Sequence, residues 1–226
     1  MKRLVSITVV SIIVILLFMV QGCSGISVNA PDSDLTTKFD PEEVASSLIV
    51  EDYSFKDALP GGYVCLAITN PTKFDISMAI TLKTYDASGN ILTVKNSTPE
   101  YISEGQTILE YFVLNEDYAS KDYSFSVSEA RLECCVANEL DSSSVSRNDK
   151  EIVSVTNNGK YTARSVEVTT LFLKNDVPVY LDWAIFGDVN QEIQPGDTAT
   201  EEMYCSRDYD EVKIFLQDSC WLGLAN

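Results

Sequence analysis

The clearest pattern in the chain is a strict two-residue alternation over residues 76–83. Ile76, Met78, Ile80 and Leu82 alternate with small or polar residues, which predicts a β-strand with one buried face. Residues 63–69 are apolar at both parities and predict a central, well-buried strand. Shorter apolar runs bounded by turn residues predict further strands over residues 48–55, 91–94, 107–114 and 123–127.

The second half of the chain repeats the first. Ile68-Thr69-Asn70 matches Val155-Thr156-Asn157, and the alternating strand matches residues 166–172. The turn at Glu104-Gly105 matches Pro195-Gly196, and Asp122-Tyr123 matches Asp208-Tyr209. A period of about 90 residues made of short strands and turns predicts a duplicated β-sandwich. We therefore expect an all-β fold with two tandem immunoglobulin-like sandwiches, over residues 47–136 and 137–226.

The start of the chain resembles a bacterial lipoprotein signal. Lys2 and Arg3 precede an apolar run over residues 4–20, and Gly22 stands before Cys23. The resemblance implies cleavage after residue 22 and modification of Cys23 with fatty acyl chains such as palmitate. An uncleaved transmembrane helix is the alternative, because the run is close to the minimum for a bilayer span. In both cases the basic residues stay in the cytoplasm, so the rest of the chain faces outward at the cell membrane.

Residues 23–46 predict a flexible tether between the membrane and the first sandwich. They are rich in Asp, Ser, Thr and Pro and contain little that could pack in a core. Near the end of this segment, Pro41-Glu42-Glu43-Val44 predicts a short helical turn with Asp40 as its N-cap.

Charge and composition exclude several kinds of partner and chemistry. The chain has 34 acidic and 16 basic residues, a formal net charge of −18, and no histidine. So acidic a chain repels phosphate backbones, so we expect no nucleic-acid partner. Without histidine there is no Ser-His-Asp or Cys-His catalysis and no imidazole metal site, and no Cys-x-x-Cys spacing indicates zinc. We expect no enzymatic activity, no cofactor and no metal site.

Five cysteines remain besides Cys23. Their number is odd, so at least one thiol stays unpaired within the chain. One hypothesis places a disulfide in each half, because disulfides form outside the cell. The other treats the cysteines as small buried apolar residues. The hypothetical bridges join Cys65 to Cys134 or Cys135, and Cys205 to Cys220.

Two stretches are candidate binding sites. Residues 86–90 carry Asp86, Ser88 and Asn90, whose oxygens suit calcium, or whose hydrogen bonds stabilise a hairpin turn. Residues 177–186 are apolar at both parities and contain three aromatics that would form a surface for an envelope protein or a glycan. Alternatively, this strand lies at the junction between the sandwiches. The three aromatics are Tyr180, Trp183 and Phe186.

Residues 82–86, followed by Gly89 and later by the Glu104-Gly105 turn, resemble the bacterial FxLYD-type domains. Leu82 stands in place of the Phe and Thr84 in place of the Leu, and only Tyr85-Asp86 match literally; residues 171–175 of the second copy depart further. The resemblance implies immunoglobulin-like sandwiches, often found in tandem on lipoproteins, and brings no catalytic residues.

The function we expect is a non-enzymatic module, anchored through the lipid on Cys23, that binds or presents a ligand at the cell envelope. Two alternatives remain open. One is a structural spacer or accessory subunit of an envelope complex. The other is an envelope hydrolase that uses carboxylates alone, since paired acids such as Asp208, Asp210 and Glu211 are abundant.

Overall fold

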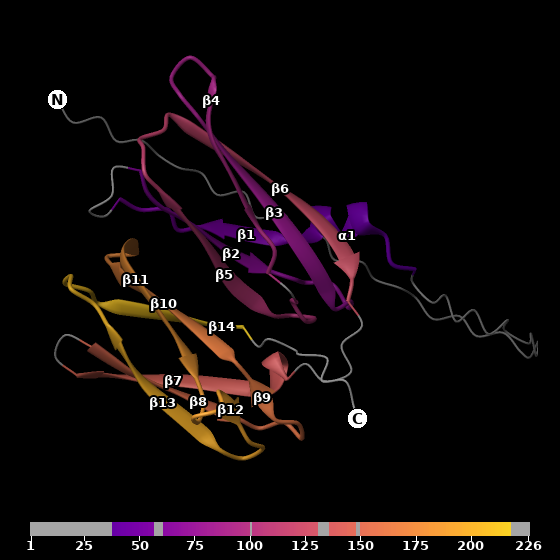
Figure 1. The fold of residues 1–226 in the computed structure, drawn as a ribbon, viewed down its shortest axis with the longest axis vertical. Coiled ribbons are helices and arrows are strands. Elements are labelled where there is room, and N and C mark those ends of the chain that lie inside the picture. The colour runs from indigo at the N-terminus through magenta and orange to yellow at the C-terminus, as the bar shows by residue number, and fades with distance from the viewer. Residues whose placement is uncertain (1–37, 57–60, 100, 131–135, 148–149, 218–226) are drawn as a thin grey trace, which may run out of the picture. The chain divides into compact units, whose positions relative to one another are not determined.

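The computed structural model describes residues 38–56, 61–99, 101–130, 136–147 and 150–217, and these residues are mostly β-strand (Figure 1). The prediction of an all-β sandwich fold is confirmed. In chain order the elements are α1 (Pro41–Ser47), β1 (Ile49–Asp52), β2 (Gly62–Thr69), β3 (Ile76–Tyr85), β4 (Ile91–Ser97), β5 (Thr107–Leu114), β6 (Ser120–Glu129), the 3₁₀ turn Ala137–Glu139, β7 (Leu140–Arg147), β8 (Lys150–Asn157), β9 (Ala163–Arg164), β10 (Val166–Lys174), β11 (Val177–Phe186), β12 (Glu192–Ile193), β13 (Thr198–Tyr204) and β14 (Glu211–Gln217).

The strands form two sandwiches with the same strand order. In the first, a sheet ordered β1-β2-β5 packs on a sheet ordered β4-β3-β6. In the second, β7-β8-β13 packs on β11-β10-β14, and β9 pairs with β12 beside them. The repeat in the sequence thus has a counterpart in the topology. Lys38–Asn226 nevertheless form one compact unit, so the division into two domains between residues 136 and 137 stays a prediction.

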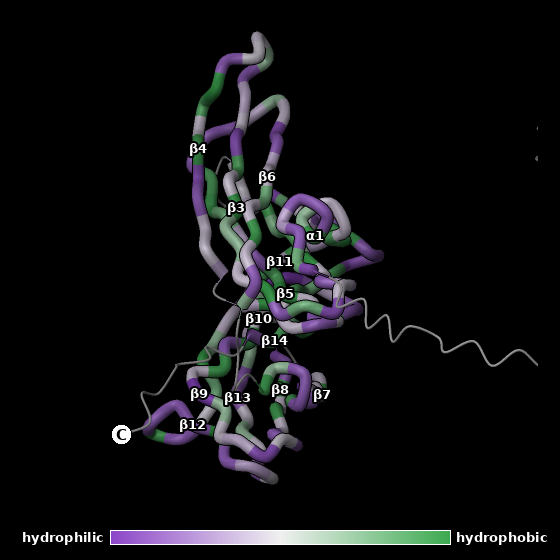
Figure 2. The backbone as a smooth tube through the Cα atoms, turned by 90° about the vertical axis from the view of Figure 1, so that its right-hand side faces the viewer, coloured by the Kyte–Doolittle hydropathy of each residue, from purple (hydrophilic) through white to green (hydrophobic). Residues whose placement is uncertain are grey.

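The core of the first sandwich follows from the alternation in β3. Ile76, Met78, Ile80 and Leu82 are at most 2% exposed, whereas Ser77, Ala79, Thr81 and Lys83, which alternate with them, are half-buried or exposed. Figure 2 shows the hydropathy of the residues along β3. Leu66 and Ile68 of β2 pack in the same core and are also fully buried. Each such side chain stabilises the fold by about 1.5–3 kcal/mol relative to an exposed one.

Helix α1 belongs to the first sandwich. The Asp40 carboxylate accepts hydrogen bonds from two backbone N–H groups of the first helical turn, at 2.9 and 3.3 Å, as predicted for an N-cap. Val44 is only 3% exposed, and Phe39 packs against the same core. The predicted tether, residues 23–46, therefore extends too far: residues 38–46 are anchored by these two apolar side chains.

The core of the second sandwich repeats this arrangement. Val166, Val168 and Phe172 of β10 point to the same face and are fully buried, together with Phe186 of β11. The Tyr209 ring meets Phe172 edge-on, with centroids 4.9 Å apart. Edge-to-face pairs of this kind add about 0.5–1.5 kcal/mol beyond the buried area.

The two halves differ in register near their last strands. Tyr123 lies in β6 opposite Leu82. Opposite Phe172, the equivalent of Leu82, lies Val212, while Tyr209 precedes β14. The predicted match of Asp122-Tyr123 with Asp208-Tyr209 is therefore wrong, because the two identical dipeptides do not occupy equivalent positions in the registers of β6 and β14.

Each sandwich holds one fully buried asparagine at the end of its central strand. The Asn70 Nδ2 donates to the backbone carbonyls of Phe74 and Ile102, at 2.7 and 3.1 Å. The Asn157 Nδ2 donates to the carbonyls at the equivalent positions, both at 2.8 Å. Buried carbonyls in loops need such partners, so each asparagine connects a strand end to two neighbouring loops.

The two sandwiches meet through one face of β1-β2-β5 and one face of β11-β10-β14. We call the apolar cluster between them the sandwich junction. It explains why the even and odd residues of β2 are both buried: the even residues fill the first core and the odd residues face the second sandwich. The buried members of the sandwich junction are Cys65, Ala67, Leu109, Leu171 and Leu173.

Candidate functional site

The predicted lipidation site and three of the predicted disulfide cysteines lie outside the described residues. Cys23, Cys134, Cys135 and Cys220 are the residues concerned. Cys65 and Cys205 are both buried, and neither is bonded to another cysteine of the described residues. Since their proposed partners are not described, the two disulfides stay predictions.

The Cys65 thiol is unsuited to nucleophilic chemistry. Burial raises its pKa to about 12, and the nearby Asp52 carboxylate acts in the same direction. The reactive form of a cysteine is the thiolate. At neutral pH Cys65 is therefore a small apolar member of the sandwich junction.

The three aromatics of the predicted partner surface do not form one surface. Phe186 is fully buried in the second core, and Tyr180 packs against that core with its ring centroid 6.3 Å from that of Phe172. Trp183 is 50% exposed. Positions 180 and 186 share one face of β11 and position 183 takes the other, because side chains alternate along a strand.

The loop over residues 86–90 is a hairpin turn stabilised by its own side chains. The Asp86 carboxylate accepts from the backbone N–H groups of Ser88 and Asn90, both at 2.8 Å, and from Asn90 Nδ2 at 2.9 Å. The hydrogen bond from the Asn90 side chain is the main cause that lowers the pKa of Asp86. Within the described parts of the chain, no group of three or more His, Cys, Asp or Glu residues is placed to hold a metal.

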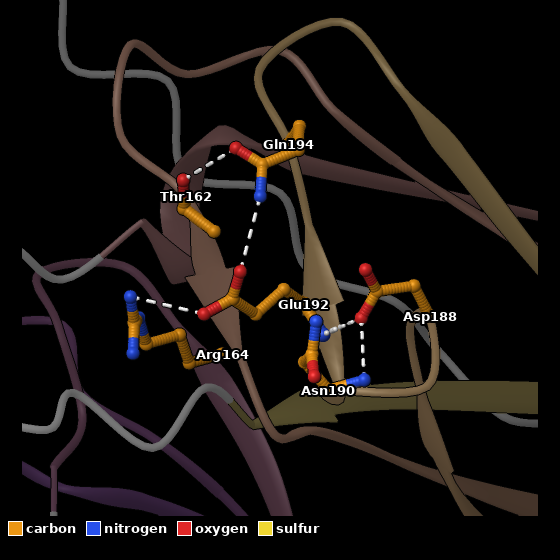
Figure 3. Close-up of polar contacts among 6 residues, drawn as sticks. All are labelled: Thr162, Arg164, Asp188, Asn190, Glu192 and Gln194. Carbon is orange, nitrogen blue, oxygen red and sulfur yellow. Dashed lines mark hydrogen bonds and ion pairs between the residues drawn. The ribbon is translucent and has the colours of Figure 1, made fainter.

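A second polar cluster, at the loop joining β11 to β12, is also satisfied internally (Figure 3). Arg164 pairs with the Glu192 carboxylate at 3.0 Å, and Thr162 donates to Gln194 at 2.8 Å. The Asp188 carboxylate accepts from the backbone N–H groups of Asn190 and Glu192, at 2.7 and 3.2 Å. These contacts hold the β9–β12 pair and the loop, so the cluster is structural.

A groove of about 430 Å³ opens beside the sandwich junction, and we call it the junction groove. Tyr53, Thr69 and Thr107 line it from the first sandwich, and Lys213 and Phe215 line it from the second. Its size lies in the usual range of small-ligand sites, about 300–1,000 Å³. Aromatic, hydroxyl and charged groups converge in it.

At the charged end of the junction groove, three side chains are linked in series by hydrogen bonds. The Lys213 Nζ donates to the Tyr53 hydroxyl at 2.6 Å and lies 4.9 Å from the centre of its ring. The Tyr53 hydroxyl donates to the Glu51 carboxylate. The hydrogen bond to Tyr53 raises the pKa of Lys213, and burial, followed by Glu51, raises the pKa of Tyr53. At neutral pH Lys213 is therefore an ammonium and Tyr53 a neutral phenol.

Another part of the junction-groove lining is neutral. Thr69 and Thr107 face each other across β2 and β5, and their hydroxyls are 2.7 Å apart. One hydroxyl donates to the other, so the pair still offers a donor and an acceptor to a ligand. Ala67 and Phe215 supply the apolar surface beside it.

Two carboxyl groups near the sandwich junction have raised pKa values. Burial, and then repulsion from Glu167, raise the pKa of Glu110, while a hydrogen bond from Ser97 at 2.5 Å lowers it. Burial raises the pKa of Glu167. Glu110 belongs to β5 and Glu167 to β10, so the two acids come from different sandwiches.

Comparisons with known proteins add no relative from which function can be transferred. No family model matches the chain, and the comparison with curated proteins found no match either. Among solved structures, red sea bream transglutaminase matches at 12% identity and a TM-score of 0.25, over 76% of this chain and 29% of the transglutaminase. A score this low carries no argument about function. No helix among the described residues is long and apolar enough to cross a membrane.

Proposed function

We propose that this protein is a membrane-anchored, extracytoplasmic lipoprotein that acts as a non-enzymatic binding module, with the junction groove as its binding site. The observation that carries the proposal is the convergence of Tyr53, Thr69 and Thr107 with Lys213 and Phe215 in one groove. Residues far apart in the sequence supply donors, acceptors and an aromatic face to a single open space. The N-terminal pattern around Cys23 supports the anchor.

The non-enzymatic part of the proposal rests on the available side chains. The chain contains no histidine, and the Cys65 thiol stays protonated at neutral pH. Lys213 stays charged, because its hydrogen bond to Tyr53 favours the ammonium form, so it is a poor nucleophile. The groups in the junction groove suit binding better than bond cleavage.

The anchor is tested by replacing Cys23. The Cys23→Ser variant should leave the membrane fraction or remain as an unprocessed precursor, whereas the unchanged protein should stay in the membrane fraction. Protease added outside intact cells should cut the unchanged protein. Normal processing and lipid attachment of the variant would show that the anchor is not at Cys23.

The binding role is tested with the full-length protein in detergent, incubated with extracts of the cell envelope. Retention of an envelope component should fall in Lys213→Met and stay unchanged in Lys95→Ala, a lysine exposed on β4. Equal retention by both variants would remove the junction groove from the proposal.

A structural spacer is the second candidate, and the sandwich junction favours it. Leu171 and Leu173 are at most 1% exposed between the sandwiches, so the two halves hold a fixed separation. A spacer needs no ligand. Unchanged assembly of an envelope complex in Lys213→Met, combined with loss of that complex in Leu171→Asp, would favour the spacer.

A further inference from the structure

Beside Thr107, the junction groove adjoins a second hollow. This second hollow has a volume of about 280 Å³ and shares Thr107 and Ile214 with the first. Because two lining residues are common to both, the hollows adjoin along β5 and β14, and we call the two together the elongated depression. A linear ligand, longer than one small molecule, fits such a shape.

The second hollow is lined by neutral side chains, some polar and some aliphatic. Asn138 and Ser142 are exposed there, and Gln106 lies behind them. The Gln106 Nε2 donates to the backbone carbonyl of Leu216 at 3.0 Å, and its Oε1 accepts from the backbone N–H of Ser103 at 2.8 Å. Its two ends are thereby fixed, so this wall is ordered before any ligand arrives.

We infer that the elongated depression binds a neutral oligosaccharide. Hydroxyls and amides along its length match the alternating donors and acceptors of sugar rings. Phe215 and Tyr53, both partly buried, add aromatic carbon to the lining, which suits the apolar side of a sugar ring. The inference deepens the proposed function and rests on it.

The charges in and around the first hollow favour a neutral oligosaccharide over a polyanion. Lys213 and Glu51 are joined through Tyr53, so the only charged pair in the first hollow is balanced. A polyanion would meet Glu51 and a chain with a net charge of −18. A neutral oligosaccharide is repelled neither by Glu51 nor by the net charge of the protein. Lys213 and Glu51 can instead form strong hydrogen bonds with its hydroxyl groups.

A matched pair of threonines allows a sharp test. Thr69 and Thr107 have an equivalent in the second sandwich, where Thr156 and Thr198 pair across β8 and β13 with hydroxyls 2.8 Å apart. The equivalent pair is exposed and lies outside the depression. Replacing both members of a hydrogen-bonded pair with isosteric valines has little effect on stability.

The experiment uses the full-length protein in detergent and the neutral oligosaccharides, two to eight units long, released from the envelope of the cells that make it. Binding is measured by saturation-transfer NMR and by titration calorimetry. We expect the Thr69→Val/Thr107→Val variant to raise the dissociation constant about tenfold, the effect of losing one or two ligand hydrogen bonds. The Thr156→Val/Thr198→Val variant should bind as the unchanged protein does.

Other outcomes overturn either the ligand class or the site. Sugar binding that both double variants retain would show that the sugar site lies elsewhere. Binding of an envelope peptide instead, lost in Thr69→Val/Thr107→Val, would refute the oligosaccharide and leave the junction groove as the binding site. Absence of binding to any envelope component, with the anchor at Cys23 intact, would refute the binding function as well and leave the spacer.

Discussion

Replacing the buried Asn70 with alanine should strongly destabilise the protein. Its Nδ2 serves three carbonyls, those of Phe74, Ile102 and Ser103, and the bonds to Ile102 and Ser103 are buried. Its Oδ1 accepts from Thr72 Oγ1 at 2.7 Å. Alanine removes these bonds, but the Ile102 and Ser103 carbonyls still accept from the backbone N–H groups of Ile76 and Gln106, at 3.0 and 3.1 Å. Each lost hydrogen bond therefore costs about 0.5–1.5 kcal/mol. Because several such bonds are lost together, we expect a loss of about 2–4 kcal/mol in the free energy of unfolding.

The assay is urea unfolding of the soluble chain from Ser24 onward, followed by circular dichroism and by tryptophan fluorescence. Both tryptophans, Trp183 and Trp221, lie in the second half of the chain. Because the sandwich junction couples the halves, we expect Asn70→Ala to shift the fluorescence transition as well, although Asn70 is in the first sandwich. Separate transitions would show that the halves unfold independently.

Two further variants control the interpretation. Asn70→Asp keeps the shape, removes the donor and adds a charge beside carbonyl oxygens, so it should destabilise at least as much as alanine. Asn96→Ala removes an exposed hydrogen bond with Thr81 and should change stability by less than about 0.5 kcal/mol. A loss below about 1 kcal/mol in Asn70→Ala would contradict the role given to the buried amide.

Three other predictions use the same unfolding assay. Gly62→Ala should cost more than about 2 kcal/mol and Gly89→Ala about 1 kcal/mol. Both glycines have positive φ, +70° and +84°, but an added Cβ at position 62 would clash with the Phe55 carbonyl oxygen, whereas one at position 89 meets nothing within 4 Å. Leu171→Ala should lower the free energy of unfolding by about 2–5 kcal/mol through a cavity in the sandwich junction, and a loss below about 1 kcal/mol would show that the junction does not stabilise the fold. Glu167→Gln should raise the free energy of unfolding at neutral pH. Burial raises the pKa of Glu167 above its usual 4.5, so the folded protein favours the protonated acid, and the stability gained by the variant should vanish as the pH falls below 4.5. A gain that persists below that pH would contradict this reasoning.

The strands with one buried face were predictable because burial imposes the two-residue period directly. The alternation in β3 predicted its buried residues one by one, and the double-parity pattern of β2 predicted burial on both faces. By contrast, β7 was not predicted. Only Leu140 is buried among its residues, so this serine-rich edge strand is held by backbone pairing to β8 and carries no apolar period.

The junction groove could not be predicted from local patterns. Tyr53 and Lys213 are 160 positions apart and touch only because the sandwiches pack together. No motif links them. The aromatic strand was different, since the two-residue period alone separates Trp183 from Tyr180 and Phe186. The error there was to group residues by proximity along the chain when their side chains leave opposite faces.

Comparison of the two repeats does identify the faces that meet. Ala67 in β2 faces the second sandwich, whereas the equivalent position of β8 is Ser154. In β10 Leu171 faces the first sandwich, whereas the equivalent position of β3 is Thr81. The first repeat thus has an apolar outer face on the sheet that contains β2, and the second repeat has one on the sheet that contains β10. These two sheets are not equivalent in the repeat, and at the compared positions the equivalent sheet of the other repeat carries a polar residue. Polar outer faces of this kind are found where a stack of repeats ends. The two sandwiches therefore pair with each other through their apolar faces, and within the described residues this pairing creates one junction groove.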